Sequence, residues 1–515
     1  MSNLPVIIGV GQVSGAGEKP LSDISPLRLM EEAARAAAAD AGASGGVGAV
    51  LQQINSVRVQ RFFADFSASF PSTFGRMENA PWSLAQCLGL PADELIYDAV
   101  GGDATQSAVT AAAAAIAQGK IGAAMVVGAE AMNTERAAKK AKLTLDWSQD
   151  APFKPVEPPA MPPLYSETEI AHGMNVPMVM YAFIDNALRL ARDATFDERM
   201  GQIGALFAPF AQVAAENPLA TRRDGLGADE IGRPSERNQI AAFPYTRLSV
   251  ANAFVDQSAA LILCSEKIAD ELGVPADKRV YLHAGAAAHD EWFVSHRENL
   301  AQSPAIRLIA QRVLADARIG LDEIGAFDLY SCFASAVEVA ATEIGLELDD
   351  PRGLTVTGGL PFFGGPGNNY VTHAIAQMVE RMRQMPGRYG LVTANGGLLT
   401  KHAAGVYSTT PPAEMPRYDN HPELQAEVDA VWGEPAPFAA TPEGRGWIEA
   451  YTVLHGRNGP AKGYVLGRLS NGHRFIALTP EDPDLLARME AADMSGAAGS
   501  VVTDEAGLSR FTPET

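Results

Sequence analysis

The sequence predicts an α/β protein of two similar halves, with a helical insertion between them and a small β module after them. Three observations indicate this fold class. A glycine turn, an alanine-rich helix and a β-branched strand follow one another at residues 97–132, and the same order recurs at 327–397. Residues 130–245 change to proline-rich and amphipathic patterns. Residues 420–515 alternate like antiparallel strands.

The first half, residues 1–129, opens with the apolar stretch PVIIGVGQV, which we interpret as a strand. A helix follows, with Ser25-Pro26 at its start and Gly42 at its end. After a strand at INSVRVQ, the turn YDAVGGDATQSAV leads into a helix that ends at Gly119. Because this helix has almost no polar face, we expect it to be buried between layers.

The second half, residues 246–410, repeats this plan. FDLY leads into the helix SCFASAVEVAATEIG, GGLPFFGGPGNNY opens the helix VTHAIAQMVERMR, and YGLVTANGG closes as a strand, so we expect an internal duplication. In the last region, the turn pairs Asn458-Gly459 and Asn471-Gly472 predict antiparallel hairpins. The PPAEMP segment before it has the composition of a linker, which predicts that a chain ending near Pro416 keeps its core folded.

Composition and charge exclude several classes of function. Acidic residues outnumber basic ones by 61 to 40, and no Lys/Arg block could follow a phosphate backbone, so we expect no nucleic-acid partner. No apolar run is long enough to span a bilayer. The three cysteines lack CxxC spacing and the nine histidines lack HxxxH spacing, which argues against a metal site and for a reducing, cytoplasmic setting.

Several motifs, in matching order over residues 4–410, resemble the thiolase superfamily, and most closely sterol-carrier-protein-type thiolases and thiolase-like proteins with an additional C-terminal domain. The motifs are VIIGVGQ, YDAVGGDATQSAV, VVGAEAM, VDQSAALILCSE, FDLYSCF, GGLPFFGGPGNNY and LVTANGG. The resemblance implies a five-layer αβαβα sandwich of two duplicated halves, with a loop domain inserted at 130–245. The C-terminal addition is then a small, OB-like β module.

By the same resemblance the chain acts on or binds coenzyme A thioesters and belongs to the acyltransferase class, similar to acetyl-CoA acetyltransferases. Coenzyme A thioester is then its substrate or ligand, with no covalently bound cofactor. The resemblance also suggests a homodimer or a small OB-fold protein partner. Two alternatives stay open: a non-covalent C–C lyase of the retro-aldol type on acyl-CoA, and a non-catalytic acyl-CoA or lipid binder.

The sequence departs from the superfamily at its catalytic positions. The acylated cysteine would fall at Gly102 or Asp103, and neither side chain can form a thioester. The Gly-His-Pro turn corresponds to Gly364-Gly365-Pro366, so glycine replaces the base. Tyrosine stands at 330 where the family has an oxyanion-hole histidine, and the last family cysteine would fall near Ala394. These departures make ordinary thiolysis doubtful.

Four residues are the candidates for catalysis: Tyr330, His402, Asp103 and Cys332. Tyr330 could donate to an oxyanion or be an ordinary strand-end tyrosine. Asp103 could be a general base, but we favour a helix cap. His402, past the ANGG turn, is a better candidate base than His373. For Cys332 we favour a structural role.

The candidates for substrate binding lie at or beside the glycine turns; they are Gly102, Gly365, Asn368, Asn369, Tyr370 and Asn395. The plain interpretation of the Asn-Asn-Tyr group is helix capping. The basic run with Arg136, Lys139, Lys140 and Lys142 could meet coenzyme A phosphates, although a solvated helical face is favoured. Cys87 and Cys264 lie in apolar surroundings, so we expect both in the core.

Overall fold

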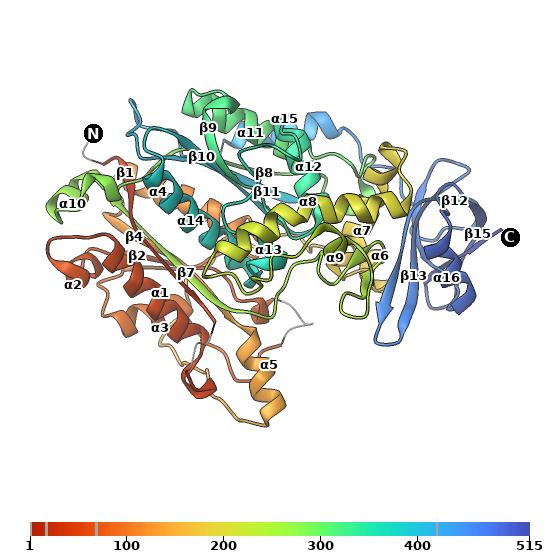
Figure 1. Cartoon of the computed structure of the whole chain (residues 1–515), viewed down its shortest axis with the longest axis horizontal. Helices are drawn as coiled ribbons and strands as arrows, with labels where there is room; N and C mark the ends of the chain where they lie inside the picture. Colours follow the sequence, from red (N-terminus) through yellow and green to blue (C-terminus); the bar gives the residue numbers. More distant parts are fainter. Residues whose placement is uncertain (1–2, 16–18, 67–70, 419–420, 515) are drawn as a thin grey trace.

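The computed structural model describes residues 3–15, 19–66, 71–418 and 421–514. Two of its three sheets form the body of the molecule (Figure 1). The first has the order β1-β7-β4-β2-β3, with β1 (Pro5–Ser14), β2 (Ser56–Val59), β3 (Glu94–Tyr97), β4 (Ala123–Ala131) and β7 (Asp256–Ser265). The second has the order β8-β11-β10-β9, with β8 (Tyr281–His289), β9 (Ile324–Asp328), β10 (Tyr389–Gly396) and β11 (Lys401–Ser408).

These two sheets repeat one topology. In the first, β1 and β4 each pair antiparallel with β7, and β2 pairs parallel with β4. In the second, β8 and β10 each pair antiparallel with β11, and β9 pairs parallel with β10. The strands β1, β7, β4 and β2 therefore correspond one by one to β8, β11, β10 and β9. This confirms the predicted duplication.

Two helices fill the space between the sheets. Helix α4 (Ala104–Ala117) contacts β1, β4 and β7 on one side and β8, β10 and β11 on the other, and α14 (Tyr370–Gln384) lies beside it. Small side chains let α4 fit between two sheets, and most of them are buried, as predicted. On the outer faces lie α1 (Pro26–Asp40), α3 (Ala80–Leu88), α11 (Pro304–Ala317) and α12 (Ala334–Ile344), which completes five layers.

The insertion is mainly helical and begins with α5 (Met132–Ala141). Its remaining elements are α6 (Glu167–Ala171), α7 (Pro177–Ala191), α8 (Phe196–Glu216), α9 (Ala228–Gly232), β5 (Ile240–Ala242) and β6 (Tyr245–Thr246). Its first part covers the outer edge of the first sheet, since the Tyr97 N–H donates to the Val156 carbonyl and the Val156 N–H donates to the Leu95 carbonyl, both at 2.9 Å. The free edge of β3 is thereby paired within the chain.

The C-terminal region forms the third sheet, at one end of the molecule (blue in Figure 1). Its elements are α15 (Pro422–Trp432), β12 (Gly444–Gly456), β13 (Gly459–Leu469), β14 (Arg474–Leu478), α16 (Pro483–Ala491), β15 (Ala498–Thr503) and β16 (Ser509–Pro513). The sheet also takes in β5 and β6, because Ala242 pairs with Leu454 and the Phe243 N–H donates to the Val453 carbonyl at 3.0 Å. The module and the insertion therefore share one sheet. A chain ending at Pro416 would lose the strand β12, with which β5 of the insertion pairs.

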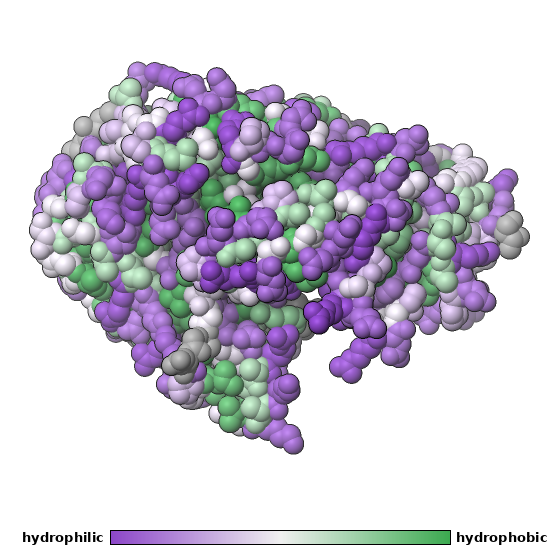
Figure 2. Space-filling model, viewed as in Figure 1, coloured by the Kyte–Doolittle hydropathy of each residue, from purple (hydrophilic) through white to green (hydrophobic). Residues whose placement is uncertain are grey.

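Short helices complete the described chain: α2 (Gly46–Leu51), α10 (Glu266–Glu271), α13 (Gly359–Phe362) and 3-10 turns that include η2 (Phe63–Asp65) and η6 (Gly367–Asn369). On the face seen in Figure 2, polar residues predominate and apolar ones occur in small groups. No helix in the described ranges is long and apolar enough to cross a membrane. Of the two cysteines expected in the core, Cys264 on β7 is buried, but Cys87 on α3 is exposed, so that expectation is wrong for Cys87.

Candidate functional site

The two glycine turns meet at the N-terminal end of α4. The first turn connects β3 to α4 and contains Gly101 at a φ of 131°, a conformation that favours glycine. The Gly101 N–H donates to Asn368 Oδ1 at 2.9 Å, and Asn368 Nδ2 donates to the Arg61 carbonyl at 2.7 Å. Asn368, from the second turn, thus fixes the first turn across 267 residues of sequence.

Gly102 is one of the two positions at which the family resemblance puts a cysteine, and the site leaves no space for a side chain there. A β-carbon on Gly102 would lie 2.5 Å from the backbone carbonyl oxygen of Asn395 and 2.5 Å from Tyr330 Oη. Gly365, at the position of the missing histidine, is different: a β-carbon there would meet its nearest atoms at 3.4 Å or more. A side chain would therefore not fit at Gly102 without displacing its neighbours, whereas a side chain would have space at Gly365.

Asp103 forms an ion pair with Lys401 inside the first turn. Its side chain accepts no hydrogen bond from the N-terminus of α4, so the favoured helix-cap interpretation is wrong. Instead, Asp103 Oδ1 lies 3.0 Å from Lys401 Nζ, with side-chain exposures of 14% and 9%. The absence of side chains at Gly101 and Gly396 makes room for this pair, since β-carbons there would lie 2.2 and 1.9 Å from Asp103 Oδ1.

Lys401 is a residue of this site that the sequence motifs do not indicate. It begins β11, and its ammonium also donates to the Val100 carbonyl and lies 3.2 Å from Met161 Sδ. A β-carbon on Gly101 would lie 2.5 Å from Lys401 Nζ, which places the ammonium directly against the turn. A cation thus lies against the turn that contains Gly102 and Asp103, the two positions at which the family resemblance puts a cysteine.

Tyr330 brings a phenol to the same place. Its backbone N–H donates to Thr393 Oγ1 at 3.0 Å, and its ring meets Tyr370 edge-on at 5.5 Å. The Tyr330 hydroxyl makes no hydrogen bond to any residue that the structure describes. Burial, aided by nearby Cys332 and Asp103, raises the pKa of Tyr330 well above its usual value of 10, so it remains a proton donor at neutral pH.

Asn395 and Cys332 lie beside Tyr330, together with Tyr181 from the insertion. Asn395 Nδ2 donates to Tyr181 Oη at 2.9 Å and lies 3.9 Å from Cys332 Sγ. Asn395 Oδ1 is buried and has no hydrogen-bond partner among the described residues. Burial raises the pKa of Cys332 to about 12, which keeps its thiol protonated and supports the structural interpretation.

His402 lies on the other face of the sheet from Lys401, because neighbouring residues of a strand point to opposite faces. Its Nε2 is 3.2 Å from Asp290 Oδ2, and the side chain is 3% exposed. Together with Tyr330, Thr393 and Asn395 it lines a cavity of about 20 Å³, whose other walls are apolar residues, mainly from α11, α12, β10 and β11. A space of that size holds about one water molecule.

The other predicted residues make hydrogen bonds that hold the fold together. Asn369 Nδ2 donates to the Gly128 carbonyl at 2.8 Å, and Tyr370 Oη donates to Asp328 Oδ1 at 2.9 Å. His373 Nδ1 lies 2.8 Å from Gln12 Oε1 on β1, and burial lowers the pKa of His373 to about 3. The structure therefore brings Gly102, Asp103, Tyr330, Cys332, Asn368 and Asn395 together. The polar groups of Asn369, Tyr370 and His373 instead bind to the Gly128 carbonyl, Asp328 and Gln12.

The proline-rich segment at 158–165 covers this site. Met161 lies on the Lys401 ammonium, and a β-carbon on Gly397 would lie 3.2 Å from Leu164. The Pro163 carbonyl accepts a hydrogen bond from Trp292 Nε1 at 2.7 Å, which attaches the segment to the second half. Within the described ranges, no group of three or more His, Cys, Asp or Glu side chains is placed to hold a metal.

The whole chain matches a solved structure with the same fold and the same C-terminal addition. It is the monomeric SCP2-thiolase-like protein type 1 from Mycobacterium smegmatis, with 34% sequence identity, a TM-score of 0.84 and coverage of 100% of both chains. The chain belongs to this family. Residues 423–506 match the thiolase-like protein type 1 additional C-terminal domain.

More distant structures share the fold of this chain. The Ltp2-ChsH2(DUF35) aldolase matches with a TM-score of 0.56 and 18% identity, over 79% of this chain and 98% of that one. An acetyl-CoA acetyltransferase from Syntrophomonas wolfei matches with a TM-score of 0.56 and 15% identity, over 80% and 100%. No match was found among curated protein sequences.

Restoring a cysteine at the family position should damage this protein. We expect Gly102→Cys to lower the free energy of unfolding by about 1–3 kcal/mol, the usual cost of overpacking, because its β-carbon meets Asn395 and Tyr330. Gly365→Ala is the matched control and should change it by about 0.5 kcal/mol or less, because its β-carbon has space. Urea denaturation of both variants measures the difference, and equal stabilities would contradict the closed position.

Proposed function

We propose that the protein binds a coenzyme A thioester at the first glycine turn without forming an acyl-enzyme. One observation carries this proposal: the nucleophile's position, Gly102, is closed by Tyr330 and Asn395, while Lys401 and Asp103 fill the turn beside it. The N-terminus of α4 still offers unpaired N–H groups and the positive end of its dipole to a carbonyl or carboxylate.

The side chains suit recognition of a thioester carbonyl. Tyr330 has a free hydroxyl that can donate to the carbonyl oxygen, and Asn395 has a free buried oxygen that can accept from an amide N–H. Cys332 keeps its proton and Gly365 offers no base, so neither supplies the chemistry of two-step acyl transfer. Entry of the ligand requires that the segment at 158–165 moves away from Lys401.

The unpaired Tyr330 hydroxyl favours a second candidate function, a C–C lyase acting on an acyl-CoA. In a retro-aldol cleavage, a base takes the hydroxyl proton of a 3-hydroxyacyl thioester while the bond between C2 and C3 breaks, and C2 of the enolate then takes a proton to give the shorter acyl-CoA. The Asp103 carboxylate is the base that this site offers. The products are a ketone or aldehyde and a thioester enolate, to whose oxygen Tyr330 can donate. Release of acetyl-CoA or propionyl-CoA from a 3-hydroxyacyl-CoA, detected by chromatography, would favour this function over binding alone.

Calorimetric titration with acetyl-CoA, with free coenzyme A as the reference ligand, tests the binding proposal. We expect Tyr330→Phe to weaken acetyl-CoA binding by about 3- to 10-fold, the loss of one hydrogen bond, with little effect on coenzyme A itself. Tyr464→Phe, in the C-terminal module, is the control and should leave both affinities unchanged. Absence of acetyl-CoA binding, or equal effects of the two variants, would contradict the proposal.

A further inference from the structure

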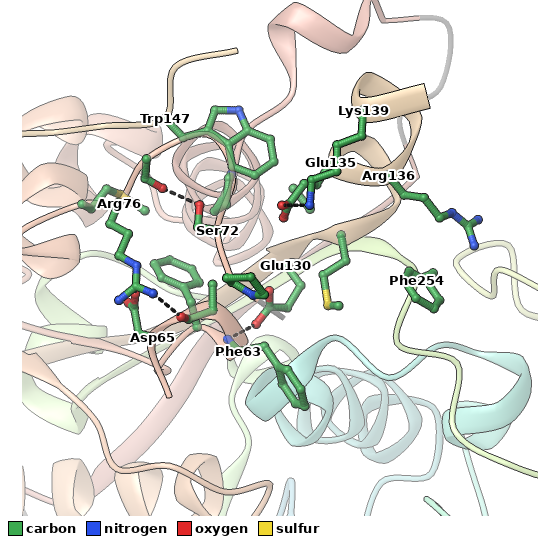
Figure 3. Close-up of a pocket in the computed structure, with 18 residues that line it drawn as sticks. Phe63, Asp65, Ser72, Arg76, Glu130, Glu135, Arg136, Lys139, Trp147 and Phe254 are labelled. Atoms are coloured by element: carbon green, nitrogen blue, oxygen red, sulfur yellow. Dashed lines mark hydrogen bonds and ion pairs between the residues drawn. The ribbon is translucent and has the colours of Figure 1, made fainter. Parts of the chain in front are cut away.

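A second, larger pocket lies on the first half of the molecule. Its volume is about 310 Å³, and it shares no lining residue with the cavity beside His402. Its walls come from η2, the chain at 71–77, the end of β4 and the start of α5 (Figure 3). Its apolar lining residues include Phe62, Phe63, Met132, Trp147 and Phe254. This is a common size for a small-molecule site.

Glu130, near the end of β4, is one of the residues that line this pocket (Figure 3). Its side chain accepts one hydrogen bond, from the Phe63 N–H to Oε1 at 2.7 Å, and the residue is only 5% exposed. A β-carbon on Gly367 would lie 2.4 Å from Oε1, so the carboxyl also rests against the second glycine turn. No Lys, Arg or His nitrogen of the described chain lies within 4 Å of Glu130 to form an ion pair.

The other two carboxylates of the pocket already have partners. Asp65 is 3.5 Å from Arg76, and Glu135 is 2.7 Å from Lys139. These acids are 14% and 15% exposed, whereas their basic partners are 55% and 47% exposed, so the acidic groups face inward and the basic groups reach solvent. Figure 3 shows Arg136 directed away from Glu130, and its guanidinium lies over Phe254. The interior of the pocket therefore has acidic character.

We propose that this pocket binds a small organic cation, a primary ammonium group on an apolar body. The ammonium would pair with the ionised form of Glu130, which, unlike Asp65 and Glu135, has no cationic partner among the described residues. The indole of Trp147, which lines the pocket, suits both an apolar body and a nearby cation. A neutral ligand of the same shape would lack the ion pair.

Binding should be coupled to release of a proton. Burial, with contributions from Asp65 and Glu135, raises the pKa of Glu130 to about 8, so the carboxyl is largely protonated at neutral pH. Only its ionised form can pair with an ammonium. Affinity should therefore rise about tenfold per pH unit below pH 8 and level off above it. The other ionisable side chains of the pocket are Asp65, Arg76, Glu135, Arg136 and Lys139.

Titration of the full chain with benzylammonium chloride, with benzyl alcohol as the neutral reference, tests the proposal. Calorimetry at about pH 6, 7 and 9, in buffers of different ionisation enthalpy, reports both affinity and proton release. We expect tighter binding at each higher pH and release of about one proton at the lowest pH. Benzyl alcohol should bind at least tenfold more weakly than benzylammonium at the highest pH.

Two variants separate Glu130 from its acidic neighbours. Glu130→Gln, which keeps the shape of the side chain, should weaken benzylammonium binding at least tenfold at high pH. Glu135→Gln removes an acid that Lys139 already neutralises and should change the affinity less than threefold. Equal binding of both ligands, unchanged binding in Glu130→Gln, or no benzylammonium binding at the highest pH would overturn the proposal. If Glu130→Gln does not fold, the proton release measured with the unmodified protein tests the proposal, and no release at the lowest pH would overturn it.

Discussion

Replacing Lys401 by methionine should lower the free energy of unfolding by about 3–5 kcal/mol, the usual cost of breaking a buried ion pair from one side. The reason is that Asp103, with a side chain only 14% exposed, would keep its charge without a partner inside the first glycine turn. Methionine has nearly the length of lysine, so the packing against Val100 and Met161 is largely kept. Urea denaturation at neutral pH measures the loss.

The double variant Asp103→Asn/Lys401→Met is the matched control. It removes both charges and should recover most of the lost stability, because replacing both partners of a buried pair is often close to neutral. A single variant that stays within about 1 kcal/mol of the unmodified protein would show that the pair contributes little, as exposed pairs do. In that case the Asp103–Lys401 ion pair would not be what stabilises the first glycine turn.

A chain ending at Pro416 should lose the folded insertion, the second large effect that we expect. The cut removes β12, with which β5 pairs, and Tyr451, against which Phe196 packs edge-on at 5.7 Å. It also removes Asp493, the partner of the buried Arg189 at 2.9 Å. Buried aromatic surface and an unpaired strand edge would then face water.

Hydrogen exchange followed by mass spectrometry measures this effect segment by segment. In the truncated chain, α7 and α8 should exchange much faster than in the full chain, and the protein should aggregate. Trp447→Ala in the full chain is the control, because this side chain lies on β12 but is 37% exposed, and it should leave the protection of α7 and α8 unchanged. Cooperative unfolding of the truncated chain, with α7 and α8 fully protected, would contradict the shared sheet.

Much of the fold could be predicted because the two halves carry the same local signals. Glycine turns, small-residue helices and β-branched strands recur in one order, and each half builds the same sheet from them. The junction of the C-terminal module with the insertion could not be predicted. The strands that make it, β5 and β6, have only three and two residues, too few to show any alternation.

The site was predicted less completely than the fold. His402 and Lys401 are adjacent in sequence, and strand alternation places one on each face, but the sequence does not say which face meets the glycine turn. The position of Asp103 at the start of α4 predicts a helix cap, whereas its ion-pair partner, Lys401, comes from β11, far along the chain. Tyr181 lies on an amphipathic insertion helix whose pattern predicts a buried face without naming the residue that it contacts.

Intact mass spectrometry tests the central claim most directly. The protein is mixed with excess acetyl-CoA or acetoacetyl-CoA, under conditions in which calorimetry detects binding, and is then denatured and weighed. We predict the mass of the unmodified chain, because Gly102 is closed and the Cys332 thiol keeps its proton. A stoichiometric acyl adduct that maps to Cys332, Cys87 or Cys264 would contradict the account, since a relocated nucleophile would then carry out two-step acyl transfer.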